Sequence, residues 1–211
     1  FTETPDSTPK WLEAHGDSHW SLFSSDYGLS LQKRFFDCYL KGEKQGWERQ
    51  PKVQLNIRHP AEKFVLRAEE EWPLARTQWR KLYLDPARQA LSTRPLAQAA
   101  KIEYEALGNG VTFRLPPLEK AMEITGPMAA KLFICSATRD ADLFLIVRVF
   151  DLAGKELTFM GSTDPTTPIA KGWLRGSHRR LDPARSKPYR PFHPHDRAEP
   201  LTPGEVYECD V

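Results

Sequence analysis

A chain of 211 residues with 40% hydrophobic and 27% charged residues can bury a core in one or two domains, which excludes a disordered chain. Its 30 basic and 28 acidic residues are interspersed and leave a formal charge of +2, so electrostatics implicates neither nucleic acid nor a membrane surface as a partner. The three cysteines are far apart and outside any C-x-x-C spacing, which argues against a disulfide framework or a zinc site and favours a reducing, cytoplasmic setting.

The first fifty residues predict one strand, one loop and one helix. Residues 11–14 (WLEA) are typical of a short buried strand that runs into a polar loop over residues 15–20. Apolar side chains then recur at helical spacing over residues 27–41, and Gly42 supplies a stop. One strand and one helix do not make a domain, so we expect a larger domain before this segment. A first residue that is Phe1 rather than methionine agrees with that expectation.

Beyond residue 50 the hydrophobic pattern changes to a period of two. Val53, Leu55 and Ile57 alternate with polar residues, as in a half-buried strand. Residues 142–151 carry apolar side chains on both faces, which predicts a central strand, and a tight turn at residues 151–155 follows. Further short strands are predicted at residues 63–67, 79–84, 102–106, 111–115, 121–125, 128–136, 156–160 and 206–211. This pattern predicts a mainly β fold, a β-sandwich or jelly roll over residues 51–211. Since the chain stops inside its last strand, we expect further strands to complete that sheet.

No complete catalytic or metal-binding motif is present. The chain lacks a G-x-S-x-G nucleophile elbow, a G-x-G-x-x-G loop, a P-loop, an H-E-x-x-H pair and clustered Cys/His ligands. His15 and His19 are four residues apart, but they lie in a loop without a third ligand. Asp140 and Asp142 fall short of the roughly six to eight oxygen ligands of calcium, which favours a role in a turn. We therefore expect neither a metal nor a cofactor.

A basic motif at Gly172–Arg180 and the scattered tryptophans allow two interpretations each. The basic side chains either bind an acidic group or hydrogen-bond the proline-rich loop at residues 183–203, and we favour the loop, with Trp173 and Leu174 in the strand core. The tryptophans Trp20, Trp47, Trp72 and Trp79 either form a sugar-stacking platform or lie in the core, and the core is the usual place for single tryptophans.

Short motifs along the chain follow a recognisable order. The segment Gly28–Gly46 contains RFFD-x-x-LKG, and Glu71–Leu74 (EWPL) precedes a YL pair. Later motifs are Thr112-Phe113, Leu118-Glu119, Ile124–Pro127, Asp140–Phe144 and Gly172–Arg179. Together they resemble the C-terminal region of the X-prolyl dipeptidyl-peptidase and cocaine-esterase-like (CocE/NonD) serine hydrolases, over nearly the whole chain. The resemblance implies the end of an α/β-hydrolase domain at residues 1–50 and a galactose-binding-like jelly roll at residues 51–211, truncated at its end.

The resemblance also implies a catalytic role for one histidine. His15 is similar in position to the family's triad histidine, although Leu12-Glu13-Ala14 precede it where relatives often show PW-x before the His-Gly pair. In α/β-hydrolases the triad histidine follows the serine and the acid in the chain and lies on a loop after the last strands, where it acts as general base. His19 is the second candidate, and an ordinary loop histidine is the simpler interpretation of either.

The nucleophile and the acid are expected before Phe1, so this chain alone is expected to be inactive. Its expected partners are an upstream α/β-hydrolase domain of the same protein or a companion chain, and a small ester or peptide substrate, with Xaa-Pro peptides one possibility. The sequence does not decide between esterase and peptidase. The alternative is a non-catalytic jelly-roll module that binds carbohydrate or another ligand, since sandwich folds host many functions.

Overall fold

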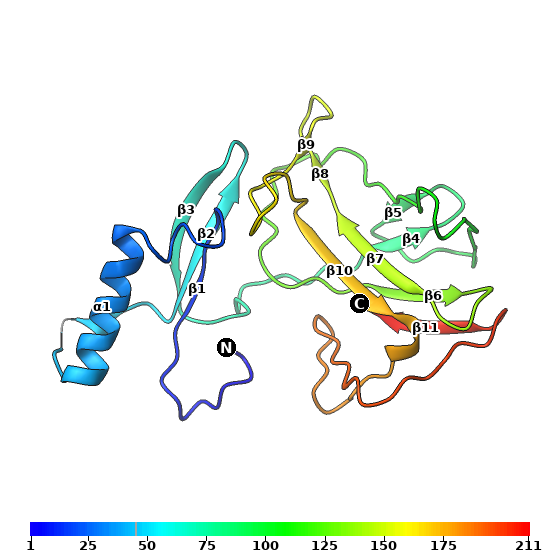
Figure 1. Ribbon diagram of the computed structural model, residues 1–211. Helices are drawn as coiled ribbons and strands as arrows, with labels where there is room; N and C mark the ends of the chain where they lie inside the picture. The colour runs from blue at the N-terminus through cyan, green and yellow to red at the C-terminus, as the bar shows by residue number, and fades with distance from the viewer. Residues whose placement is uncertain (45) are drawn as a thin grey trace. The chain divides into compact units, whose positions relative to one another are not determined.

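The computed structural model describes residues 1–44 and 46–211 and shows a mainly β chain with few helices, as predicted (Figure 1). The chain divides into two compact units. The first unit combines Phe1–Ala75 with Gly126–Val211, and the second is Arg76–Thr125. In the described residues the strands form one three-stranded sheet and four two-stranded ribbons, none of them closed into a barrel.

The first unit opens with a β-α-β arrangement. Strand β1 (Leu12–Ala14) pairs in parallel with β2 (Val53–His59), and helix α1 (Asp26–Lys41) lies between them in the chain. Strand β3 (Lys63–Glu69) then pairs antiparallel with β2. The predicted strand, helix and first strands of the period-two region are therefore confirmed, with small shifts at their ends.

Local sequence explains where α1 begins and ends. The Ser25 side chain accepts a hydrogen bond of 3.1 Å from the backbone N–H of Gly28, which satisfies one of the free donors of the first turn. At the other end Gly42 takes a left-handed conformation with φ 71°, which costs glycine little. A short 3-10 helix, η1 (Trp47–Arg49), leads from there toward β2.

The two faces of the β1–β2 pair differ in polarity. Val53 and Leu55 are 0% and 3% exposed and form a core with Leu74. Because side chains alternate along a strand, the other face carries the register pair Glu13 and Gln54. One face is therefore an ordinary hydrophobic core, and the other is polar.

The remainder of the first unit consists of paired strands. These strands are β6 (Lys131–Cys135), β7 (Asp142–Val147), β8 (Val149–Phe150), β9 (Glu156–Leu157), β10 (Ala170–Arg175) and β11 (Val206–Asp210). A 3-10 helix, η2 (Gly176–His178), directly follows β10. Three antiparallel pairs result: β6 with β11, β7 with β10, and β8 with β9 (Figure 1). The turn between β8 and β9 is closed by the backbone N–H of Asp151, which donates to the carbonyl of Lys155 at 2.9 Å. The predicted hairpin is thereby confirmed.

The predicted central position of the strand at residues 142–151 is wrong. Within the described part of the chain β7 pairs only with β10. Phe144 and Ile146 are 76% and 57% exposed, whereas Leu143 and Leu145 on the other face are partly buried. An apolar pattern on both faces predicts burial only when a second partner covers the outer face, and periodicity does not report that partner.

The second unit contains one hairpin, β4 (Tyr83–Asp85) with β5 (Ala90–Ser92). The strand predicted at residues 79–84 is confirmed only at its end, and the one at 111–115 is reduced to a bridge from Arg114 to Ala90. The strands predicted at residues 102–106 and 121–125 are wrong. Alternating side chains favour an extended backbone, but a strand also needs a hydrogen-bonded neighbour, which these segments lack among the described residues.

Candidate functional site

His15 directly follows the carboxyl end of β1. Its side chain is exposed, and its Nδ1 lies 3.1 Å from the carbonyl oxygen of Gly16. Gly16 is buried, and a Cβ on it would lie 1.9 Å from the Phe64 ring of β3, so only glycine allows this approach. The His-Gly pair is therefore held by its neighbours: β1 sets where the loop begins, and Phe64 requires the glycine.

His19 lies farther along the same loop. It is exposed, and its ring packs edge-on against Trp20 with 4.4 Å between the ring centroids. In residues 1–44 and 46–211 neither His15 nor His19 hydrogen-bonds a serine, a cysteine or a carboxylate. Both predicted histidines lie in one loop, and no serine or cysteine of the described residues is hydrogen-bonded to either of them.

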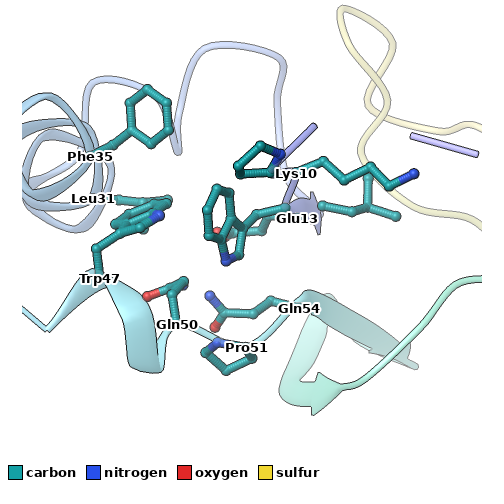
Figure 2. A pocket seen from close by; sticks show the side chains of 11 residues that line it. Lys10, Glu13, Leu31, Phe35, Trp47, Gln50, Pro51 and Gln54 are labelled. Atoms are coloured by element: carbon teal, nitrogen blue, oxygen red, sulfur yellow. The ribbon is translucent and has the colours of Figure 1, made fainter. Parts of the chain in front are cut away.

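A pocket of about 360 Å³ lies between α1 and the polar face of the β1–β2 pair (Figure 2). Its lining comes from β1 and the residues before it, from α1, from η1 and from the start of β2. These residues are Pro9, Lys10, Trp11, Leu12, Glu13, Leu31, Phe35, Trp47, Gln50, Pro51 and Gln54. Aromatic rings meet at its wall, since Trp47 packs edge-on against Trp11 at 5.3 Å and against Phe35 at 5.2 Å. Of the four tryptophans predicted to lie in the core, Trp47 is 5% exposed, as expected. Trp20 and Trp79 are 69% and 51% exposed, so the prediction is wrong for those two.

Glu13 and Tyr27 connect β1 with the first turn of α1. The Tyr27 hydroxyl donates to Glu13 Oε2 at 3.0 Å. Burial of the phenol, together with the negative charge and hydrogen bond of Glu13, raises the pKa of Tyr27 to about 12. Tyr27 therefore stays a neutral donor at physiological pH and holds one carboxylate oxygen of Glu13 in place.

The basic motif of β10 and η2 binds the loop that follows it. Arg179 Nη1 donates to the carbonyls of Gly176 and Glu199 at 3.1 and 2.5 Å, and its guanidinium lies 4.3 Å from the Tyr207 ring centroid. Arg180 pairs with Asp196 of the loop. The interpretation that these cations order the loop is confirmed.

Trp173 and Leu174, the adjacent apolar residues of that motif, differ in exposure. Leu174 is 5% exposed and lies in the core, as predicted. Trp173, predicted to be core as well, is 72% exposed, so that prediction is wrong. Trp173 pairs in register with Phe144, and both lie on the uncovered outer face of the β7–β10 ribbon.

Asp140 and Asp142 make separate contacts on either side of the start of β7. Asp140 Oδ1 accepts hydrogen bonds from the backbone N–H groups of Ala141 and Ser177, at 2.9 and 2.8 Å. Asp142 forms a bidentate pair with Arg175 across the β7–β10 ribbon, with 2.7 Å and 3.0 Å between the paired atoms. Among the described residues no three His, Cys, Asp or Glu side chains are placed to hold a metal ion together.

Comparison with known proteins assigns most of the chain to one family. The profile of the X-Pro dipeptidyl-peptidase C-terminal non-catalytic domain matches residues 45–211. Two crystal structures of a CocE/NonD family hydrolase from Staphylococcus aureus superpose with a TM-score of 0.81 and 27% identity over 95% of this chain. Two curated relatives, from Mycobacterium bovis and Mycobacterium tuberculosis, are provisionally named serine esterases and are 35% identical over 101 residues, 46% of this chain.

These relatives are longer than the chain. It spans 37% of the Staphylococcus aureus hydrolase and 14% of the mycobacterial proteins. In the part of the chain that the structure describes, no helix is long and apolar enough to cross a membrane.

Proposed function

Because the chain belongs to the X-Pro dipeptidyl-peptidase C-terminal non-catalytic domain family, we propose that it is the carboxy-terminal portion of a serine hydrolase of the α/β-hydrolase type. Residues 1–50 form the end of the hydrolase domain, and residues 51–211 form the jelly roll beside it. The bond cleaved is an acyl ester or a peptide, and Xaa-Pro peptides are one option. The resemblance to a CocE/NonD hydrolase and to proteins named serine esterases supports this assignment.

The position of His15 is the observation that carries the catalytic part of the proposal. In open α/β sheets the ligand crevice lies at the carboxyl ends of the parallel strands. His15 follows the carboxyl end of β1, which is parallel to β2 and connected to it through α1. Its ring is exposed and free to meet a serine from elsewhere. These features fit a triad histidine at the end of an α/β-hydrolase domain.

The proposed chemistry needs groups from an upstream domain or a companion chain. His15 takes the proton of the serine nucleophile as it attacks the acyl carbon, and then returns it to the leaving group. The serine, the carboxylate that orients the imidazole and the oxyanion-hole donors come from that partner. The 211-residue chain by itself therefore has no nucleophile to activate and is inactive.

The test uses the longer protein with its hydrolase domain and compares two histidines of one loop. His15→Ala should lower ester or peptide hydrolysis by about 10²- to 10⁴-fold, because proton transfer from the serine is lost. His19→Ala is the matched control and should retain activity. Both variants should give the unfolding curve of the parent, since both side chains are exposed.

Two results contradict the proposal in different ways. If His19→Ala abolishes hydrolysis while His15→Ala retains it, the assignment within the loop is wrong. If the folded parent neither hydrolyses activated acyl esters nor reacts with a fluorophosphonate probe for nucleophilic serines, the serine-hydrolase assignment itself is wrong.

A further inference from the structure

The pocket between α1 and the β1–β2 pair contains buried polar atoms that lack partners. The Trp47 side chain is only 5% exposed, yet its indole Nε1–H donates to no described residue. Glu13 Oε1 is also buried and accepts no hydrogen bond within the described chain, although Oε2 is held by Tyr27. A buried polar atom left unpaired costs free energy, so such atoms at one pocket point to a missing ligand or to water.

Gln54 adds a further polar group to the wall of this pocket. The residue is 9% exposed, lines the pocket from the start of β2, and its side-chain amide has no hydrogen bond to another described residue. In Figure 2 its amide points toward the side chain of Gln50. The pocket therefore offers one donor from Trp47, one acceptor from Glu13, and both from Gln54.

The charges around the pocket favour an uncharged ligand. Glu13 contributes a carboxylate, and Arg34 of α1 lies close by, where its guanidinium stacks 5.6 Å from the Trp47 ring centroid and donates to Gln50. Lys52 already lies over the Trp11 ring at 4.7 Å, and the Lys10 ammonium is engaged by Thr4 and Asp6. A cationic ligand would meet aromatic faces that protein cations already occupy, and an anionic ligand would meet Glu13.

Hydroxyl groups meet these requirements, because one hydroxyl can donate to Glu13 and another can accept from Trp47 or Gln54. The walls from Trp11, Phe35 and Leu31 are apolar and suit the C–H face of a ring. The volume of about 360 Å³ lies at the small end of ligand pockets. We propose that this pocket binds a neutral, hydroxyl-bearing ring of monosaccharide size. The proposal does not depend on the hydrolase assignment, since His15 does not line the pocket.

The test measures sugar binding to the 211-residue chain by calorimetry and by saturation-transfer NMR. The probes are D-glucose, D-galactose, D-mannose and N-acetyl-D-glucosamine, with D-glucuronate and D-glucosamine as charged counterparts. At least one neutral sugar should bind with a Kd on the order of 1 mM, and its charged counterpart should bind more weakly.

Three variants identify the pocket. Gln54→Leu and Trp47→Phe each remove the proposed hydrogen bond while keeping much of the side-chain shape, and each should weaken binding about tenfold. Gln98→Leu is the matched control, because Gln98 is exposed and lies in the second unit. This variant should bind sugar as tightly as the parent. A far-ultraviolet spectrum and an unfolding curve for each variant separate lost binding from lost folding.

The proposal is overturned by any of three results. No neutral sugar binds up to about 50 mM; or sugar binds equally well to folded Gln54→Leu and Trp47→Phe; or only the charged sugars bind. In the first case ordered water satisfies the buried groups, which a polar cavity of this size can hold. His15→Ala should leave sugar binding unchanged, so failure of this proposal and failure of the hydrolase assignment are distinguishable.

Discussion

Replacing Asp140 should test how η2 is fixed to the start of β7. Asp140 Oδ1 accepts from two backbone N–H groups, those of Ala141 and Ser177, and Ser177 is 3% exposed. Asp140→Ala leaves the buried Ser177 N–H without an acceptor and exposes the Ala141 N–H to solvent. Hydrogen bonds to a charged group contribute about 1.5–3 kcal/mol, and an orphaned buried donor costs about 1–3 kcal/mol, so we expect a loss of about 2–4 kcal/mol in the free energy of unfolding.

Asp140→Asn separates the acceptor from the charge. The asparagine Oδ1 can accept both hydrogen bonds, so this variant should lose about 1 kcal/mol. Asp142→Ala is a second control two residues away, where the lost pair with Arg175 is about half exposed on both sides and contributes little. Urea unfolding gives the comparison, with the midpoint read at an unchanged slope. The reasoning is refuted if Asp140→Ala is no less stable than Asp140→Asn, or if Asp142→Ala loses as much as Asp140→Ala.

The pH dependence of Asp140 gives an independent check with a defined sign. Burial raises the pKa of this carboxyl, but the hydrogen bonds from Ser177 and Ala141 outweigh it, so the pKa lies below its usual value of 3.8. A carboxyl with a lowered folded pKa stabilises the protein above its unfolded pKa, and the contribution is lost as pH falls through the folded pKa. The stability difference between the parent and Asp140→Asn should therefore be constant near neutral pH and shrink below about pH 4.

Two further predictions concern the first unit. Leu55→Ala should cost about 2–5 kcal/mol in urea unfolding, because Leu55 is 3% exposed in the core, whereas Leu66→Ala on the neighbouring strand, 49% exposed, should cost far less; equal losses would contradict the assigned core. In α1, hydrogen bonds from Lys33, the larger effect, and from Lys41 lower the pKa of Asp37 below 3.8. Lys33→Met should therefore raise the pKa of Asp37 toward 3.8 in an NMR titration. An unchanged pKa would contradict the pairing.

Where a segment makes its own contacts, the sequence predicts the structure well. The helix over residues 27–41 depends on a stripe of apolar residues, a Ser25 cap and Gly42, all within the segment itself. The hairpin at residues 151–155 likewise depends on local turn residues, including Gly154 at φ 80°. The strands predicted at residues 102–106 and 121–125 fail because alternation describes one strand and not the neighbour it needs.

The exposed outer face of the β7–β10 ribbon follows the same logic. Phe144 and Trp173 have the composition of a core, and composition alone predicts their burial. In the described chain they are 76% and 72% exposed because no further strand or layer covers them. What an apolar side chain packs against is a property of the whole assembly, so sequence periodicity could predict the strand but not its surroundings.

The site residues divide in the same way. The place of His15 in a loop directly after a strand could be predicted because that signal is local, whereas its catalytic role stays a prediction. The pocket could not, because Glu13 and Gln54 become neighbours only through the parallel register of β1 and β2, with the whole of α1 between them in the chain. If β2 shifted by one residue along β1, the Gln54 side chain would point into the hydrophobic core and the Val53 side chain would point toward α1. The register is therefore held by Val53 and Leu55 on the core face, and the polar pocket on the other face is a consequence of their burial.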